Sequence, residues 1–234
     1  PCADRNLDAI YRSERPSANE IRAIAKYIAD AIDHVHKKGV IHGDVKLLNA
    51  VRFGTRIRLV DFDASSSTIG EGSFAGAKFS SGMLPPEMIA ELSFVEYGQY
   101  INYFGKHSSD AAGWEKIEPK GVNGADTLFA VRTFRTKQKE KRIVQDDKPI
   151  STMCEEPVER DDLTYILVKA APAIDIWSFG ALLYELHASE ALFAVNRDDD
   201  LKDGATMKDL YEWNDTTKNT KLEKVSDPYL LVSS

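Results

Sequence analysis

The sequence predicts an α+β fold that is mainly helical and has short β-hairpins. Three observations lead to this prediction. Residues 17–39 combine a capping box with apolar residues at helical spacing, residues 172–187 are apolar on nearly every face, and short apolar runs separated by turn residues lie between 40 and 60. With 234 residues, 43% of them apolar and 29% charged, the chain has enough material to bury one sizeable core.

The clearest predicted helix begins at Ser17-Ala18-Asn19-Glu20. In a capping box the serine and glutamate side chains each satisfy an amide that the first helical turn leaves unbonded. Apolar residues follow at helical spacing, namely Ile21, Ile24, Ala25, Ile28, Ile32 and Val35. Lys37-Lys38-Gly39 then supplies cationic last-turn residues and a glycine able to adopt the left-handed conformation that ends a helix.

Short strands are predicted after this helix, at 40–41, 50–53 and 57–60. Gly54-Thr55 separates the last two runs and predicts a hairpin turn. Residues 64–81 are rich in serine and glycine and show little periodicity, so we expect a long loop there.

The second half of the chain predicts one buried helix and a segment of different character. Residues 172–187 begin with a proline suited to a first helical turn, and 206–213 predict a shorter helix. Between them, 91–170 contains Asn123-Gly124, which favours a hairpin turn, and a basic run at 132–142.

Charge and cysteine content exclude several classes of protein. The net charge of −7 gives no global field that favours nucleic acid or an anionic membrane surface. Cys2 and Cys154 are far apart and have no metal-like spacing, which favours a reducing, cytoplasmic compartment. The most apolar stretch, 174–186, is too short and too polar to span a bilayer.

The residues with the strongest chemical meaning lie between 42 and 61. The octet from His42 to Asn49 reads H-x-D-x-K-x-x-N, and Asp61 follows Asp44 by seventeen residues. Phosphoryl transfer needs a carboxylate that orients the acceptor hydroxyl and takes its proton, a cation near the moving phosphoryl group, and hard oxygen ligands for magnesium. Asp44, Lys46, and the pair of Asn49 and Asp61 suit these needs in turn.

This pattern resembles the eukaryotic protein kinase superfamily, whose catalytic loop reads H-R-D-L-x-x-x-N and whose metal-binding aspartate opens D-F-G. Pro85-Pro86-Glu87 stands where such kinases have A-P-E, and residues 175–180 resemble the start of their central helix. A lysine at position 46 resembles the serine/threonine kinases more than the tyrosine kinases. The resemblance implies a kinase C-terminal lobe that uses ATP and Mg²⁺ and phosphorylates serine or threonine hydroxyls of a protein substrate.

The resemblance also implies roles for residues of the nucleotide site. Asn49 and Asp61 would hold the metal, and Val51 would form the floor of the adenine pocket. His42 would support the metal-binding loop and take no part in acid/base chemistry. Asp175 would bond to the backbone of the catalytic loop.

Further along the chain, the resemblance implies that Ser80 or Ser81 bonds to Asp44 and Lys46. Two positions depart from the family pattern. Gly43 replaces the arginine that usually pairs with a phosphorylated activation loop, so activity should not need that switch. Asp63 replaces the glycine of D-F-G and adds a carboxylate beside the metal ligands.

The same comparison predicts a division of the chain into three parts. Residues 1–90 and 171–234 would form the two parts of a C-terminal lobe, the second truncated, and 91–170 would be a large insertion between the activation segment and the central helix. The basic run of the insertion would either bind an acidic docking partner or form a solvated surface. No G-x-G-x-x-G loop and no V-A-I-K lysine precede residue 40, so we expect the N-terminal lobe to be absent and the chain to belong to a longer protein.

Three functions agree with these residues. The first is an active serine/threonine kinase within a longer parent protein, because the isolated chain should be inactive without the N-terminal lobe. The second is a pseudokinase or scaffold, which Asp63 and the insertion favour. The third is a small-molecule phosphotransferase, since His-Gly-Asp also occurs in antibiotic-kinase relatives of the fold, although Lys46 and residues 175–180 argue against it.

Overall fold

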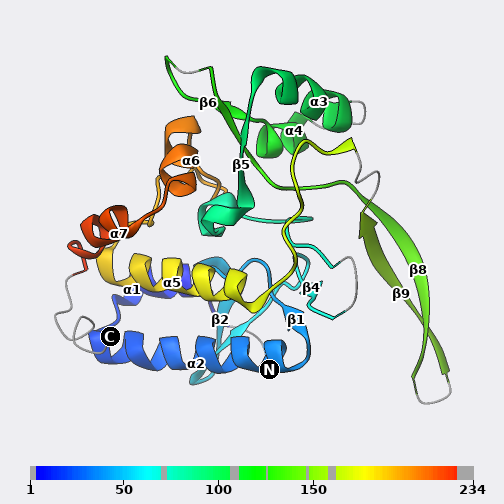
Figure 1. The fold of residues 1–234 in the computed structure, drawn as a ribbon. Coiled ribbons are helices and arrows are strands. Elements are labelled where there is room, and N and C mark those ends of the chain that lie inside the picture. The colour runs from blue at the N-terminus through cyan, green and yellow to red at the C-terminus, as the bar shows by residue number, and fades with distance from the viewer. Residues whose placement is uncertain are drawn as a thin grey trace.

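The computed structural model describes residues 4–69, 73–105, 111–124, 126–145, 148–157 and 162–225, and it confirms a mixed α+β architecture (Figure 1). The helices of the described residues are α1 (Leu7–Glu14), α2 (Ala18–Lys37), α3 (Phe94–Gly105), α4 (Ala111–Ile117), α5 (Pro172–Ala188), α6 (Gly204–Tyr211) and α7 (Asp215–Leu222). Their short 3₁₀ helices are η1 (Leu47–Asn49), η2 (Ser81–Met83) and η3 (Pro86–Met88).

Helix α2 forms as the sequence predicts. The Ser17 hydroxyl accepts from the Glu20 amide, and the Glu20 carboxylate accepts from the Ser17 amide, which completes the capping box. The helix ends at Lys37, and Gly39 follows with φ +71°, the left-handed conformation expected of a terminating glycine. Helix α2 lies beside α5 in Figure 1, and both helices contact strand β1 (Val40–Ile41), which precedes the loop of predicted catalytic residues.

The predicted short strands are also present. Strands β2 (Ala50–Phe53) and β3 (Arg56–Leu59) pair antiparallel, and Gly54 in the turn between them has φ +60°. Strand β1 (Val40–Ile41) pairs antiparallel with β4 (Ser66–Ser67). Strand β4 therefore lies inside the segment 64–81, which the sequence predicts to be a loop, and η2 begins at the end of that segment.

Residues 89–157 contain two further antiparallel units. Strands β5 (Ile89–Leu92), β7 (Leu128–Val131) and β6 (Lys120–Gly121) form a sheet with β7 in the centre, and Asn123-Gly124 lies in the connection from β6 to β7. Strands β8 (Thr136–Gln145) and β9 (Lys148–Pro157) form a separate two-stranded ribbon, which projects from the body of the molecule (Figure 1). The basic run was not predicted to be a strand, and its alternating lysines belong to β8.

Two of the described helices that the sequence analysis did not predict have recognisable caps. Asn6 accepts from the Ala9 amide at the start of α1, and Ser93 and Glu96 form a reciprocal pair at the start of α3. A search for S-x-x-E would have found the second. In the described part of the chain, no helix combines the length and apolarity that crossing a membrane requires.

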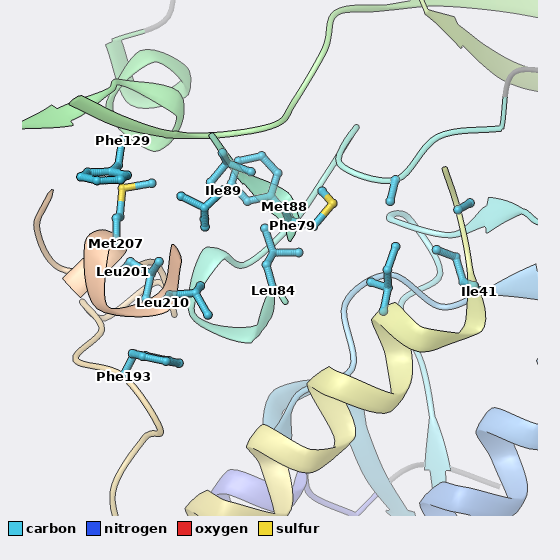
Figure 2. Close-up of a cluster of buried hydrophobic side chains, with 14 residues drawn as sticks. Ile41, Phe79, Leu84, Met88, Ile89, Phe129, Phe193, Leu201, Met207 and Leu210 are labelled. Atoms are coloured by element: carbon cyan, nitrogen blue, oxygen red, sulfur yellow. The ribbon is translucent and has the colours of Figure 1, made fainter. Parts of the chain in front are cut away.

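Helix α5 connects the two largest hydrophobic clusters. Its residue Ile174 packs in a cluster with the sheet and α6, while Leu182 and Leu186 pack in a second cluster with α1 and α2. Figure 2 shows the first cluster, in which Phe129 of β7 lies against Met207 of α6 and Met88 lies beside Phe79. The buried central helix that the sequence predicts at 172–187 is therefore confirmed.

We predict that Leu182→Ala lowers the free energy of unfolding by about 2–5 kcal/mol, because the substitution leaves a cavity at a position with no solvent exposure. Ile176→Ala on the same helix is the matched control, since 55% of Ile176 is exposed and its loss should cost less than about 1 kcal/mol. Urea denaturation measures both values. Equal losses would contradict the central position of α5.

Candidate active site

A buried carboxylate of α5 fixes the loop that contains the predicted catalytic residues. Asp175 of α5 has no solvent exposure, and its two oxygens accept from the backbone amides of His42 and Gly43, each at 2.8 Å. The oxygen that binds His42 also lies 2.7 Å from Nε2 of His36. The structure thus has the Asp175 contact that the sequence resemblance implies, and it adds His36, which the sequence analysis did not select.

Gly43, which the sequence resemblance aligns with an arginine, has a backbone conformation that favours glycine. Its φ is +79°, and a Cβ atom there would approach the carbonyl oxygen of Ala64 to 2.3 Å. In this conformation a side chain does not fit between the catalytic loop and the segment that follows Asp61. An arginine at position 43 would therefore require this backbone to change, whereas the expected independence from loop phosphorylation stays a prediction.

His42 is completely buried and has a structural role. Its Nδ1 accepts from the Asp44 amide at 3.4 Å, so Nε2 carries the proton and donates to the carbonyl of Val60 at 3.0 Å. Its ring centroid lies 4.6 Å from that of Phe62. His42 therefore contacts the backbone at both Asp44 and Val60, as a supporting residue would.

Asp44 is oriented by Asn49. The side-chain amide nitrogen of Asn49 donates to both the backbone carbonyl and Oδ2 of Asp44, each at 2.9 Å. The other carboxylate oxygen, Oδ1, is buried and has no hydrogen-bond partner. A buried carboxylate oxygen without a donor is costly unless a ligand supplies one, so Oδ1 marks where a hydroxyl group would bind.

Lys46 meets three oxygen atoms. Its ammonium group donates to Oγ of Ser80 at 2.7 Å and lies 3.4 Å from Oδ2 of Asp44. The sequence resemblance implies that Ser80 or Ser81 bonds to both Asp44 and Lys46. Ser80 has the bond to Lys46, and no hydrogen bond joins it to Asp44 among the described residues. A carboxylate oxygen of Asp199 also lies 3.4 Å from the lysine nitrogen, which the sequence analysis did not predict.

Asp199 belongs to the loop between α5 and α6. Its φ is +60°, and its carbonyl accepts from the Gly82 amide at 2.9 Å. The next residue, Asp200, is buried and accepts from the amide and hydroxyl of Ser81 at 2.8 and 3.1 Å. The sequence offers one signal for these two residues, which is the run of three consecutive aspartates at 198–200.

The predicted nucleotide-binding residues surround the β2–β3 hairpin. The Val60 amide donates to the carbonyl of Asn49 at 2.9 Å. Asp61 is the next residue after Val60, and it is exposed. Val51 is partly buried in β2 opposite Arg58. These contacts bring Asn49 and Asp61 to one region, whereas the roles of Val51, Asn49 and Asp61 toward a nucleotide stay predictions.

Glu185 of α5 has a raised pKa. Burial, together with the negative charges of Asp199 and Asp8, raises the pKa of Glu185 to about 7, although Arg12 opposes this. Glu185 lies on α5 and Asp8 on α1, so the effect combines charges from three parts of the chain.

Part of the basic run serves internal contacts. The Arg132 guanidinium donates to the carbonyls of Ile89 and Ile166 at 3.3 and 2.9 Å, and Arg135 lies 4.6 Å from the ring centre of Tyr103. The side chains of Lys137, Lys139, Lys141 and Arg142 lie outside those that the structure describes.

Comparisons with known proteins found similarity to protein kinases over part of the chain. The protein kinase domain family matches residues 2–105. A Drosophila melanogaster protein that carries the name mitogen-activated protein kinase 14C is 38% identical over 63 residues, which are 26% of this chain and 18% of that protein. A chain in the crystal structure of the yeast RNA Pol II CTD kinase CTDK-1 complex has a TM-score of 0.45 and 13% identity, covering 84% of this chain and 41% of that one. The chain therefore spans less than half the length of either.

We predict that Asp175→Asn lowers the free energy of unfolding by about 3–5 kcal/mol, because an amide nitrogen would face a buried backbone donor and leave it unbonded. Asp33→Asn is the control, since Asp33 pairs with Lys37 on the exposed face of α2 and should change stability little. Chemical denaturation followed by circular dichroism measures the difference. Equal stability of the two variants would contradict the anchoring role of Asp175.

We predict that Glu185→Gln stabilises the protein at about pH 8 and has little effect at about pH 4.5. The folded pKa of about 7 lies above the ordinary value of 4.5, so the stability due to the tightly bound proton is present below 4.5 and lost as pH rises through 7. Partial exposure reduces the gain to about 1–2 kcal/mol. Urea denaturation at several pH values tests this, and a pH-independent difference would contradict it.

Proposed function

We propose that the protein transfers the γ-phosphate of ATP to serine or threonine hydroxyls of a protein substrate. The match of residues 2–105 to the protein kinase domain family supports this proposal. The observation that carries this proposal is the unpartnered, buried Oδ1 of Asp44, whose second oxygen, Oδ2, lies 3.4 Å from the ammonium group of Lys46. An acceptor hydroxyl would supply the missing donor. Ser80, held by Lys46, supports the serine/threonine class.

The proposed reaction divides the chemistry between two residues. Asp44 orients the acceptor hydroxyl and takes its proton as the hydroxyl oxygen bonds to the γ-phosphorus. The bond from that phosphorus to the β–γ bridging oxygen breaks, and ADP leaves with the electron pair. Lys46 offsets negative charge on the moving phosphoryl group from a position fixed by Ser80 and Asp44.

The residues present fit a magnesium nucleotide. The Asn49 amide nitrogen is committed to Asp44, which leaves the Asn49 oxygen to act as a ligand beside the exposed carboxylate of Asp61. Among the described residues, no group of three or more histidine, cysteine or acidic side chains is placed to hold a metal. Two ligands suit magnesium, which usually keeps several waters and takes further oxygens from the substrate phosphates. Val51 is proposed to contact the adenine.

The proposal includes an organisation for the whole protein. Residues 1–90 and 171–234 are proposed as parts of a kinase C-terminal lobe, and 91–170 as an insertion that contributes a docking surface for a protein partner. The chain covers 18% of its Drosophila relative, so the proposed activity is that of a longer, cytoplasmic protein supplying an N-terminal lobe.

A pseudokinase is the second candidate, and one contact favours it. Asp199 lies as close to the Lys46 ammonium as Asp44 does, at 3.4 Å, and a carboxylate in that place competes with phosphate oxygens for the cation. Asp63, which stands where the family has glycine, is exposed and pairs with Lys78 at 3.3 Å. Such a protein would bind nucleotide or partners without transferring phosphate.

We predict that Asp44→Asn in the complete gene product lowers kcat for a serine peptide by about 10²-fold or more, because the amide cannot take the hydroxyl proton. Asp30→Asn is the control, since Asp30 pairs with Lys26 on the surface of α2. Transfer of radiolabelled phosphate measures the rate. An unchanged rate would remove Asp44 from the mechanism, and nucleotide binding without any transfer by the unmodified protein would support the pseudokinase.

A further inference from the structure

Segment 73–76, which leads toward Ser80, is paired on one side with a strand-like stretch near residue 168. The Ala75 amide donates to the carbonyl of Val168 at 2.9 Å, and the Ala170 amide donates to the carbonyl of Ser73 at 3.0 Å. These two bonds form an antiparallel bridge centred on Phe74 and Lys169. The proposed activation segment is therefore held by main-chain bonds that need no modification.

The other side of the same segment meets Thr133, which follows β7. The Thr133 hydroxyl donates to the carbonyl of Gly76 at 2.6 Å, and both groups are buried. Gly76 has φ +97°, and a Cβ atom there would lie 2.6 Å from the carbonyl oxygen of Arg132. The close approach of the two backbones is possible only because residue 76 has no side chain.

Thr133 itself is rigidly held. Its amide donates to the Tyr165 hydroxyl at 3.2 Å, and that hydroxyl donates to the Thr133 carbonyl at 2.9 Å. Burial raises the pKa of Tyr165, so the phenol keeps its proton and remains a donor. The Arg132 amide also donates to the carbonyl of Met88 at 2.7 Å. Thr133 thus has fixed attachments on the sheet and on the stretch near 165.

Gly76 lies only four residues before the serine that binds the catalytic lysine. Between them Phe79 is buried and packs beside Met88, as Figure 2 shows. Ser80 then accepts from Lys46 at 2.7 Å. A shift of Gly76 would pass through this short, packed connection to the Ser80 hydroxyl, because buried neighbours leave little room for independent movement.

We propose that Thr133 is a positioning residue, which fixes Gly76 and thereby places Ser80 against Lys46. The proposal rests on the proposed kinase function for its effect on catalysis, while the structural effect is independent of it. It assigns to 91–170 a role within the active site besides docking. The bonds of Thr133 and of the stretch near 168 hold the segment in the absence of a phosphate and of an arginine at position 43.

Hydrogen–deuterium exchange of this chain tests the structural effect. Thr133→Val keeps the shape of the side chain and removes the donor, so exchange of the Ala75 amide and of peptides covering 73–81 should accelerate about tenfold or more. Thr220→Val is the matched control, since it removes an exposed hydroxyl that donates to the Thr216 carbonyl. Thr133→Ser keeps the hydroxyl and should restore slow exchange.

Two results would overturn the proposal. Unchanged exchange at 73–81 in Thr133→Val would show that the hydroxyl does not hold the segment. Acceleration spread equally over α2, α5 and the β2–β3 hairpin, with a lower Tm, would show that Thr133 serves general stability only. Neither result depends on phosphate transfer, so a failure of the proposed function leaves the exchange experiment interpretable.

In the complete gene product, Thr133→Val should lower kcat about tenfold while KM for ATP stays within about twofold, because the displaced Ser80 affects Lys46 and leaves Asn49, Val51 and Asp61 in place. Thr133→Ser should recover most of kcat. A rise in KM with unchanged kcat would overturn the positioning role, even in a protein that transfers phosphate.

Discussion

The buried carboxylate of Asp175 is the interaction on which the rest of the site depends. A charge without solvent exposure is costly unless donors surround it, and here two backbone amides and the His36 ring supply them. Those amides belong to His42 and Gly43, so the hydrogen bonds that stabilise the buried carboxylate also fix the backbone just before Asp44. The helix that builds the core and the loop that would perform the chemistry are thus one cooperative unit.

Around this unit the charges are arranged to hold a single cation. Lys46 lies between the carboxylates of Asp44 and Asp199, with Ser80 as a neutral acceptor. Two anions beside one ammonium keep it in place before any nucleotide arrives. Asp199 also adds to the effect of burial in raising the pKa of Glu185, so one carboxylate affects both Lys46 and a residue of α5.

The sequence allowed prediction of elements whose signals are local. Helix α2 has a capping box and a terminating glycine, the β2–β3 hairpin has Gly54-Thr55, and the octet at 42–49 has fixed spacing, so each was found without tertiary information. Asp199 and Thr133 were not found, because each acts through a partner more than fifty residues away. Helix α7 was also missed, since it has no buried residue and therefore no apolar periodicity.

Gly43 and Gly76 have the same geometry at the two ends of one stretch of chain. Each has a positive φ, and at each a Cβ atom would meet a carbonyl oxygen, that of Ala64 or that of Arg132. The backbone is closely packed against a neighbouring backbone at Ala64 and again at Gly76. Both glycines should therefore resist replacement by any other amino acid.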